Sequence, residues 1–334
     1  MTLVAVAELE ATIAAALVRA RTSPENAAAV ARALTQAEVD GQKGHGLSRV
    51  ASYAAQSRAG KVDGFAVPVV TRPKPGVLAI DVGHGFAYAA LDEVVAQLPA
   101  MARDNGIAMA GLVRSHHFGV AGRVVERLAE AGLVALVVGN TPQAMASWGG
   151  RTPVFGTNPL AFAAPRPGAA PVVVDLALSQ VARGKILTAA QKGEPIPAGW
   201  ALDADGQPTT DAAAALKGTL TPLGGAKGSA LAFMVEVLAV TLTGANFAFE
   251  ASSFLDDKGG PPGVGQLVIG IDTGALSGSD VYAGRMAALC GLIESDAGAR
   301  LPGTRSLALR AKAARDGLEV DDKLYAEARA LAGL

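Results

Sequence analysis

Short apolar runs alternate with amphipathic segments between residues 77 and 138, and this alternation constrains the fold more than any other feature. Residues 77–82, 107–113 and 133–138 have the length and apolar composition of buried strands. The segments between them, 88–105 and 119–131, carry apolar residues at helical spacing. The pattern predicts a β-α-β-α-β unit, in which helices cover a sheet.

The following region has a different texture. Residues 160–164 and 171–175 are predicted strands joined by a Pro-Gly turn, and a turn is also expected at 203–206. A long apolar helix is predicted at 224–244, followed by a strand at 265–272. Consecutive strands joined by turns indicate antiparallel pairing. The expected fold class is therefore α/β with mixed α+β character.

Both ends of the chain are predicted to be helical. The segments are 8–20, 24–39 and about 47–56 at the start, and 279–295 and 306–334 at the end. The second helix begins with Ser23, Pro24 and Glu25, which are a cap residue, a proline at the first helical position and an acid. Each helical end alone has too few apolar residues to form its own hydrophobic core, so the two are expected to pack together.

Composition excludes several classes of protein. The 334 residues suggest about two domains, and 50% of them are hydrophobic, which is too many for a disordered chain. The 29 Lys and Arg balance the 30 Asp and Glu, so a nucleic-acid partner is not expected. One cysteine excludes a disulfide framework. The most apolar run, 229–242, is interrupted by Glu236, and no membrane span or signal peptide is expected. A cytoplasmic protein is predicted.

Two common nucleotide-binding motifs are missing. Gly83-His84-Gly85 follows a predicted strand but lacks the third glycine of a Rossmann fingerprint. In residues 224–229 the lysine and a glycine are transposed relative to a P-loop. With four histidines and one cysteine, no metal site is predicted.

Two histidine-containing segments are candidates for chemistry. In Gly44-His45-Gly46-Leu47-Ser48-Arg49, the histidine and arginine are four residues apart and would share one helix face. Such a pair could move a proton and grip a carboxylate, although a solvated arginine beside a helix-start histidine is an alternative. Residues 114–119 follow a strand and contain two adjacent histidines, which point different ways, so at most one is expected to be catalytic. Packed histidines at a helix start are the alternative there.

Three glycine-containing turns are candidates for binding. Residues 155–159 offer backbone N–H groups and short polar side chains, 224–228 open the long apolar helix with a lysine, and 301–305 form a Gly-Thr-Arg turn. A helix N-terminus with a lysine suits a phosphate, while ordinary turns and a flexible connection are the alternatives. Together these segments predict a carboxylate substrate and a phosphorylated cofactor bound without a Rossmann loop.

The chain resembles the non-Rossmann malate/L-lactate dehydrogenase family, which includes malate, sulfolactate and ureidoglycolate dehydrogenases and the piperideine- and pyrroline-2-carboxylate reductases. The matching stretches occur in the family's order: GHGLSR (44–49), SHHFGVAG (115–122), FGTNPLAFAAP (155–165), VVDLALSQVARGK (173–185), IPAGWALDADGQPTTD (196–211), PLGGAKGSALAFMVEVLAVTLTGA (222–245) and LPGTR (301–305). The resemblance implies an oxidoreductase dependent on NAD(H) or NADP(H), with the cofactor on a largely antiparallel sheet domain. It also implies a homodimer.

The resemblance further implies an organisation and a set of site residues. Residues 1–72 and 288–334 would form a helical dimerisation domain, 73–131 a small α/β domain and 132–287 the NAD(P)-binding domain. The implied catalytic residues are His45, His117 and Lys185, and the implied substrate-binding residues are Arg49, Thr157, Arg183 and Gly184. The implied cofactor-binding residues are His117, Phe118, Gly119, Val120, Ala121, Asp175, Leu176, Ala177, Ala226, Lys227, Gly303 and Arg305.

Two positions depart from the family's pattern. Many relatives have serine where this chain has Gly44, and the imino-acid reductases carry an acid where this chain has Lys185. A lysine suits an anionic substrate better than a cationic ring nitrogen. The expected reaction is hydride transfer between the cofactor and a small anionic 2-hydroxy or 2-oxo acid. The alternatives are reduction of a cyclic ketimine, or a non-catalytic protein that retains the fold.

Overall fold

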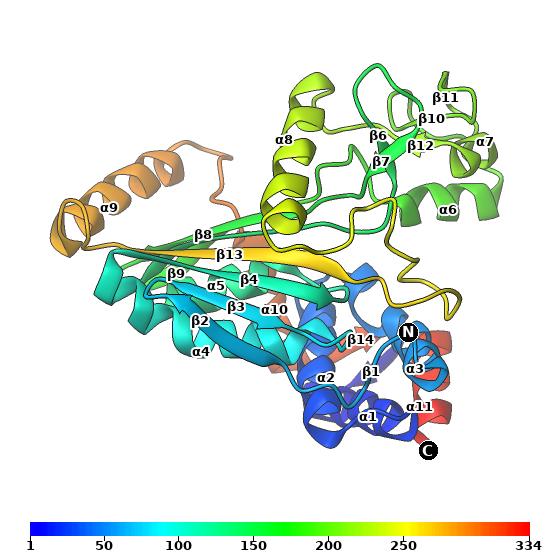
Figure 1. Ribbon diagram of the computed structural model, residues 1–334, viewed down its shortest axis with the longest axis horizontal. Helices are drawn as coiled ribbons and strands as arrows, with labels where there is room; N and C mark the ends of the chain where they lie inside the picture. The colour runs from blue at the N-terminus through cyan, green and yellow to red at the C-terminus, as the bar shows by residue number, and fades with distance from the viewer.

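A twisted seven-stranded sheet forms the centre of the computed structural model, which describes residues 1–334 (Figure 1). Its order is β2 (Val69–Lys74), β3 (Val77–Asp81), β4 (Ile107–Ser115), β13 (Val264–Asp272), β5 (Leu133–Gly139), β8 (Leu160–Arg166) and β9 (Ala169–Leu176). Every neighbouring pair is antiparallel except β3 and β4. The predicted fold class, mixed α/β with a largely antiparallel sheet, is confirmed.

Helices cover both faces of this sheet. Helices α4 (Ala87–Asn105), α5 (Ala121–Glu130) and α10 (Thr304–Asp316) lie on one face, and α8 (Ala226–Glu236) with the π-helical segment η3 (Val237–Thr241) lies on the other (Figure 1). Side chains alternate along a strand. In β13, accordingly, Val268 joins the core beneath α4 and α5, while Leu267 joins the core beneath α8.

The two ends of the chain pack into one lobe, as predicted, but the predicted helix at 279–295 lies outside it. The lobe contains α1 (Val6–Arg19), α2 (Pro24–Val39), α3 (Val50–Ala59) and α11 (Asp322–Ala332), and β1 (Thr2–Val4) pairs with β14 (Leu318–Val320). Both termini therefore lie together (Figure 1). At the start of α2, the Ser23 hydroxyl accepts a hydrogen bond from Asn26 N at 3.2 Å, which confirms the predicted cap.

A smaller sheet with two helices forms a third part. Its strands, in spatial order, are β11 (Pro208–Thr209), β10 (Ala201–Leu202), β12 (Thr219–Leu220), β6 (Met145–Ala146) and β7 (Pro153–Phe155). Helices α6 (Arg183–Lys192) and α7 (Ala212–Lys217) pack beside them (Figure 1). The core beneath α8 continues into this part through Ile186 and Leu220.

Helix α9 (Ser279–Ser295) projects from the body at the far end of the sheet (Figure 1). Cys290 is its only buried residue, and its thiol is free. Two side-chain contacts tie the helix to the sheet: Tyr282 Oη donates to the Pro165 carbonyl at 3.1 Å, and Arg166 pairs with Glu294 at 3.0 Å. No helix of the structure is both long and apolar enough to cross a membrane.

The structure differs from the prediction around residue 47. The expected continuous helix is instead two 3₁₀ turns, η1 (Lys43–His45) and η2 (Leu47–Arg49), followed by α3. Gly46 separates them with φ −107° and ψ −128°, values outside the helical region. The buried carboxylate of Glu38 accepts from Leu47 N at 2.7 Å and occupies the place where a side chain at residue 46 would lie. His45 therefore sits on a tight turn, not on the first turn of an α-helix.

Candidate active site

Two of the predicted catalytic residues, His45 and His117, lie against each other. His45 comes from η1, and His117 from the loop after β4. Nδ1 of His45 is 3.2 Å from Nε2 of His117, and the rings stack with centroids 5.1 Å apart and planes 10° apart. The fold thus joins two motifs that are 72 residues apart in the chain.

Two tyrosines continue this contact into the interior. The hydroxyl of Tyr53, on α3, lies 2.5 Å from Nδ1 of His117 and 3.1 Å from the hydroxyl of Tyr88, on α4. Both ring nitrogens of His117 are therefore occupied inside the protein. Neither tyrosine was predicted from the sequence as a site residue. The only sequence signal for them was a polar hydroxyl at a position of the helix that is otherwise apolar.

The neighbouring His116 turns the other way, as expected for adjacent histidines. Its Nε2 is 3.0 Å from Oε1 of Gln56. Phe254 packs against both imidazoles, with ring centroids 5.1 Å from His116 and 5.3 Å from His117. His116 is thus a packed core residue, while His117 pairs with His45.

A buried lysine holds the loop that carries Phe254. Nζ of Lys61 donates to the carbonyls of Ser253 at 2.7 Å, Asp256 at 2.9 Å and Lys258 at 2.7 Å. The Lys61 side chain is only 1% exposed. A buried ammonium needs such partners to offset its lost hydration, and here the partners fix the loop over the histidines.

Burial keeps the imidazoles of the site neutral. It lowers the pKa of His45 to about 4 and that of His116 to about 3, and the charge of Arg49 adds to both effects. The pKa of His117 is also lowered well below its usual value, first by burial and then by Arg49. Burial raises the pKa of Tyr53 to about 12. At neutral pH this group of side chains carries no charge of its own.

Arg49 supplies the positive charge beside the histidines. Its Nε donates to the Gly44 carbonyl at 2.7 Å, which fixes the side chain against η1. The side chain is partly exposed, and no carboxylate of the chain pairs with it. A guanidinium anchored in this way is suited to a carboxylate from outside the protein.

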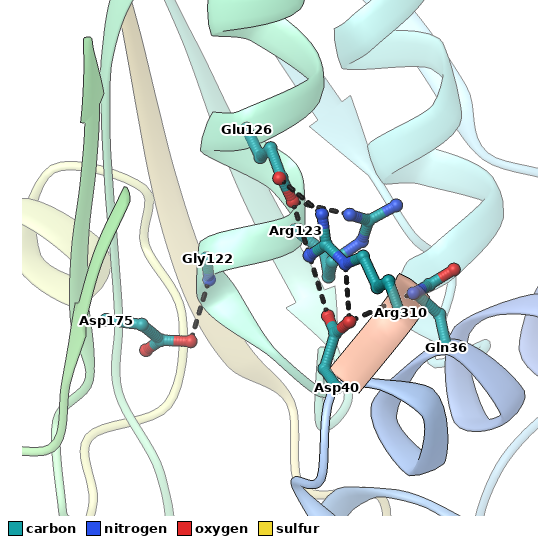
Figure 2. A network of polar contacts seen from close by, with 7 residues as sticks. All are labelled: Gln36, Asp40, Gly122, Arg123, Glu126, Asp175 and Arg310. Carbon is teal, nitrogen blue, oxygen red and sulfur yellow. Dashed lines mark hydrogen bonds and ion pairs between the residues drawn. The ribbon is translucent and has the colours of Figure 1, made fainter. Parts of the chain in front are cut away.

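A second predicted group of residues meets at a pocket of about 180 Å³. Val120, Asp175, Gly303 and Arg305, all expected to contact the cofactor, line it together. Asp175 accepts from Gly122 N at 2.9 Å, and burial raises the pKa of this carboxyl (Figure 2). Gly303 has φ +90°, which suits glycine, and Val173 packs where a side chain would project.

Charged residues from three elements form one wall of this pocket (Figure 2). Arg310 donates to Asp40 at 2.6 and 2.9 Å and to Glu126 at 2.6 and 2.9 Å. Arg123 also pairs with Glu126. The sequence reasoning missed this network because its members are single charges on α2, α5 and α10, with no local motif.

The lining of the pocket fits a phosphorylated group. Arg123, Arg305 and Arg310 all border it, but only Arg305 has no carboxylate partner. A free guanidinium is a suitable donor for a phosphate. The volume of about 180 Å³ suits one portion of a dinucleotide.

The other predicted site residues lie apart from this pocket. Arg183, Gly184 and Lys185 begin α6 and are exposed, and Arg183 donates to the Leu216 carbonyl at 2.8 Å. Ala226 and Lys227 begin α8 and are also exposed. The remaining predicted cofactor residues belong neither to the lining of this pocket nor to helix α8. They are His117, Phe118, Gly119, Ala121, Leu176 and Ala177.

Thr157 lies in a turn that a buried acid supports. Thr157 N donates to Oγ1 of Thr141 at 2.8 Å. The next residue, Asn158, has φ +41° and donates through Nδ2 to Oε1 of Glu236 at 3.0 Å. Burial raises the pKa of Glu236 to about 7. This acid, which interrupts the apolar run of α8 in the sequence, thus holds the turn in place through Asn158.

Comparisons with known proteins show the family of the chain. The family model described as malate/L-lactate dehydrogenase matches residues 4–329. The chain therefore belongs to the malate/L-lactate dehydrogenase family, and it is a nicotinamide-dependent oxidoreductase. The family resemblance expected from the motifs is confirmed.

Individual relatives cover almost the whole chain. It is 46% identical over 330 residues to a (2R)-3-sulfolactate dehydrogenase (NADP(+)) of Chromohalobacter salexigens, which covers 99% of this chain and 98% of the relative. It is 41% identical over 318 residues to a Δ1-pyrroline-2-carboxylate reductase of Ancylobacter novellus, covering 94% and 93%.

Among solved structures, a Δ1-piperideine-2-carboxylate reductase from Pseudomonas syringae has a TM-score of 0.93 and 38% identity, covering 99% of this chain and 100% of that one. A sulfolactate dehydrogenase from Methanocaldococcus jannaschii has a TM-score of 0.91 and 27% identity, covering 100% and 98%. Both enzyme types thus share this fold over its full length.

Proposed function

We propose that the enzyme interconverts a 2-hydroxy acid and a 2-oxo acid that carries a second anionic group, as malate and sulfolactate do. The observation that carries this proposal is the neutral imidazole of His45 beside the anchored guanidinium of Arg49. The 46% identity to a sulfolactate dehydrogenase over 99% of the chain supports the substrate class.

The proposed roles combine the family resemblance with the contacts of Arg49 and the histidine pair. Arg49 binds the substrate carboxylate, and Thr157 lies beside the substrate. The histidine pair takes the hydroxyl proton during oxidation and returns it during reduction. When bound, the nicotinamide supplies the hydride acceptor or donor. The protein contributes orientation, a proton path and a site without competing charges.

The pocket with Asp175, Gly303 and Arg305 is the proposed site for a phosphorylated part of the cofactor. Arg305, which has no internal partner, would bind a phosphate of NADP(H) or NAD(H). Lys227 at the start of α8 would attract another, since helix N-termini favour anions.

Lys185 and Arg183 are proposed to favour the second anionic group of the substrate. Both are exposed at the start of α6, and neither forms an ion pair in the chain. The imino-acid reductases carry an acid where this chain has Lys185, so a cationic ring nitrogen would lose a favourable partner here. This difference favours an anionic substrate over a ketimine.

Reduction of a cyclic ketimine is the second candidate, because pyrroline-2-carboxylate reductases share 41% identity and a piperideine-2-carboxylate reductase has a TM-score of 0.93. A substrate panel separates the two. Purified enzyme is assayed with NADH and NADPH on oxaloacetate, sulfopyruvate and Δ1-piperideine-2-carboxylate. Activity on the ketimine with none on the 2-oxo acids would overturn the main proposal. The Lys185→Glu variant should shift the preference toward the ketimine.

A homodimer is proposed from the exposed apolar surface. Phe233 on α8 is 62% exposed, and Leu289 and Leu292 on α9 are 57% and 72% exposed. Helix α9 otherwise packs little against its own chain, so a second copy would bury this surface. The predicted dimerisation domain, 1–72 and 288–334, includes the end of α9. Light scattering on the parent and on Leu292→Asp tests this, and a monomeric parent would contradict it.

A further inference from the structure

We propose that His45, His117, Tyr53 and Tyr88 form a proton wire that connects the substrate to an open pocket between α2, α4 and α5. This inference rests on the proposed function, because it assigns the route of the proton in that reaction. It makes His45 the group that touches the substrate, and His117 and the two tyrosines the groups that carry the proton away.

The contacts along the wire are continuous. The three consecutive links are 3.2 Å between the imidazoles, 2.5 Å between His117 Nδ1 and the Tyr53 hydroxyl, and 3.1 Å between the two hydroxyls. Each member is both a donor and an acceptor when neutral. A line of such groups can pass a proton by shifting each hydrogen to the next atom.

His117 itself is not available to the substrate. Both of its ring nitrogens are engaged, and the residue is only 6% exposed. His45 is different, because its Nε2 has no partner in the chain and is absent from the buried polar atoms that lack one. This nitrogen is therefore partly exposed and free to contact a substrate.

The far end of the wire reaches this pocket. Tyr88 lines a space of about 440 Å³ between α2, α4 and α5. Phe118 and Val120 line the same space, and the Tyr88 hydroxyl lies against the residue between them, Gly119. The walls also contain ionic side chains, including Arg32, so the pocket suits water that can accept a proton.

One proton moves along the whole wire, and every member keeps its total number of protons. During oxidation, the substrate hydroxyl gives its proton to His45 Nε2, and His45 passes its Nδ1 proton to His117 Nε2. His117 passes its Nδ1 proton to the Tyr53 oxygen, Tyr53 passes its own to Tyr88, and Tyr88 releases one to water in the pocket. The nicotinamide, when bound, would supply the hydride acceptor. Each member loses one proton and gains one, and reduction reverses every step.

The electrostatics of the site suit neutral carriers. Burial lowers the pKa of both imidazoles and raises the pKa of both phenols, so the charged forms are disfavoured at each position. Arg49 is the permanent charge that acts on all four groups. A transfer in which all members stay neutral avoids placing a second positive charge beside it.

Kinetics of Tyr53→Phe and Tyr88→Phe test the wire, with Tyr325→Phe as the matched control. The Tyr325 hydroxyl donates to Glu8 in the helical lobe, away from the site. Each of the first two variants should lower kcat about tenfold or more while KM changes less than about twofold. Their kcat should then rise with buffer concentration, because solvent bases must take the proton from His45 directly. The control should match the parent.

The outcomes separate a wire from a packing role. If Tyr53 only positions His117, then Tyr88→Phe retains full activity and no buffer dependence appears in either variant. If both variants stay within about twofold of the parent, the wire is overturned. Thermal unfolding of each variant checks that it folds.

Histidine tautomers give a test that needs no substrate. The wire requires His45 and His117 to carry their protons on the same ring position, both on Nε2 or both on Nδ1. ¹⁵N NMR of the ¹⁵N-histidine-labelled protein near pH 7.5 reports this directly, and the four histidines are assigned with single His variants. Matched neutral tautomers support the wire. Opposite tautomers or an imidazolium overturn it, even if the substrate panel shows no activity and the proposed function fails.

Discussion

The guanidinium of Arg310 spans both oxygens of the Asp40 carboxylate, at 2.6 and 2.9 Å. Arg310 lies on α10 and Asp40 at the end of α2, so this pair joins the helical lobe to the helices beneath the sheet. The same guanidinium binds Glu126 on α5 (Figure 2). One side chain therefore binds two nearly buried carboxylates.

Replacing Arg310 with methionine should destabilise the protein strongly. The substitution keeps much of the volume but leaves Asp40 and Glu126, which are 2% and 4% exposed, without their main partner. Removing one partner of a buried ion pair costs about 3 kcal/mol. Urea unfolding near pH 8 measures the change. Arg315→Met, on the same helix and paired only with exposed Asp316, is the control and should not differ from the parent.

Replacing Arg49 with lysine should weaken substrate binding. A lysine keeps the charge but loses the planar fork that binds a carboxylate through two hydrogen bonds. Loss of one charged hydrogen bond corresponds to about a tenfold higher KM for the acid substrate, with KM for the cofactor unchanged. Steady-state kinetics measure both constants. Arg58→Lys, an exposed change on α3, is the control and should leave both KM values unchanged. An unchanged substrate KM in Arg49→Lys would remove the proposed anchor.

Replacing Arg305 with alanine should weaken cofactor binding. The side chain lines the pocket and has no carboxylate partner, so it is free to bind a phosphate. We expect about a tenfold increase in the Kd of NADPH, measured by fluorescence titration. Arg300→Ala, an exposed change outside the pocket lining, serves as control. Equal affinities in parent and Arg305→Ala would place the cofactor phosphates elsewhere.

Replacing Glu236 with glutamine should change how stability depends on pH. Its folded pKa, about 7, lies above the ordinary value of 4.5, so the folded protein holds a proton that the unfolded chain releases between these values. The free energy of unfolding of the parent therefore falls as the pH rises from 4.5 to 7. Glu236→Gln should remove this dependence and exceed the parent by about 2 kcal/mol near pH 8. Urea unfolding across this range measures it.

The control for this prediction is Glu130→Gln, at the exposed end of α5. It should leave the pH profile of stability unchanged. The contrary result for Glu236→Gln is a constant difference from the parent at every pH, which would mean that folding does not shift the pKa of this carboxyl.

Much of the secondary structure follows from local sequence signals. Ser23 and Pro24 place the start of α2 correctly, and the Pro-Gly turn places the β8–β9 hairpin. Strand β2 was missed for a physical reason: it is the edge of the sheet, is largely exposed and contains Pro73. Proline is tolerated at an edge but weakens the strand pattern. A tight turn between Lys74 and Val77 closes this hairpin.

The site was predictable where its residues belong to motifs. His45, Arg49 and His117 lie on loops whose polar and glycine content distinguishes them from the apolar chain. Tyr53 and Tyr88 could not be found in this way, because each occupies a buried helix position where an aromatic ring fits equally well for packing alone. The role proposed for them depends on a hydroxyl contact between helices, which no local pattern encodes.

The position of β13 has a consequence for the synthesis of the chain. This strand, residues 264–272, lies between β4 and β5 and is hydrogen-bonded to both. The two halves of the large sheet therefore cannot join until about four-fifths of the protein has left the ribosome. Until then β4 and β5 each expose an unpaired apolar edge, which favours aggregation. We expect the nascent chain to depend on chaperones until residue 272 emerges.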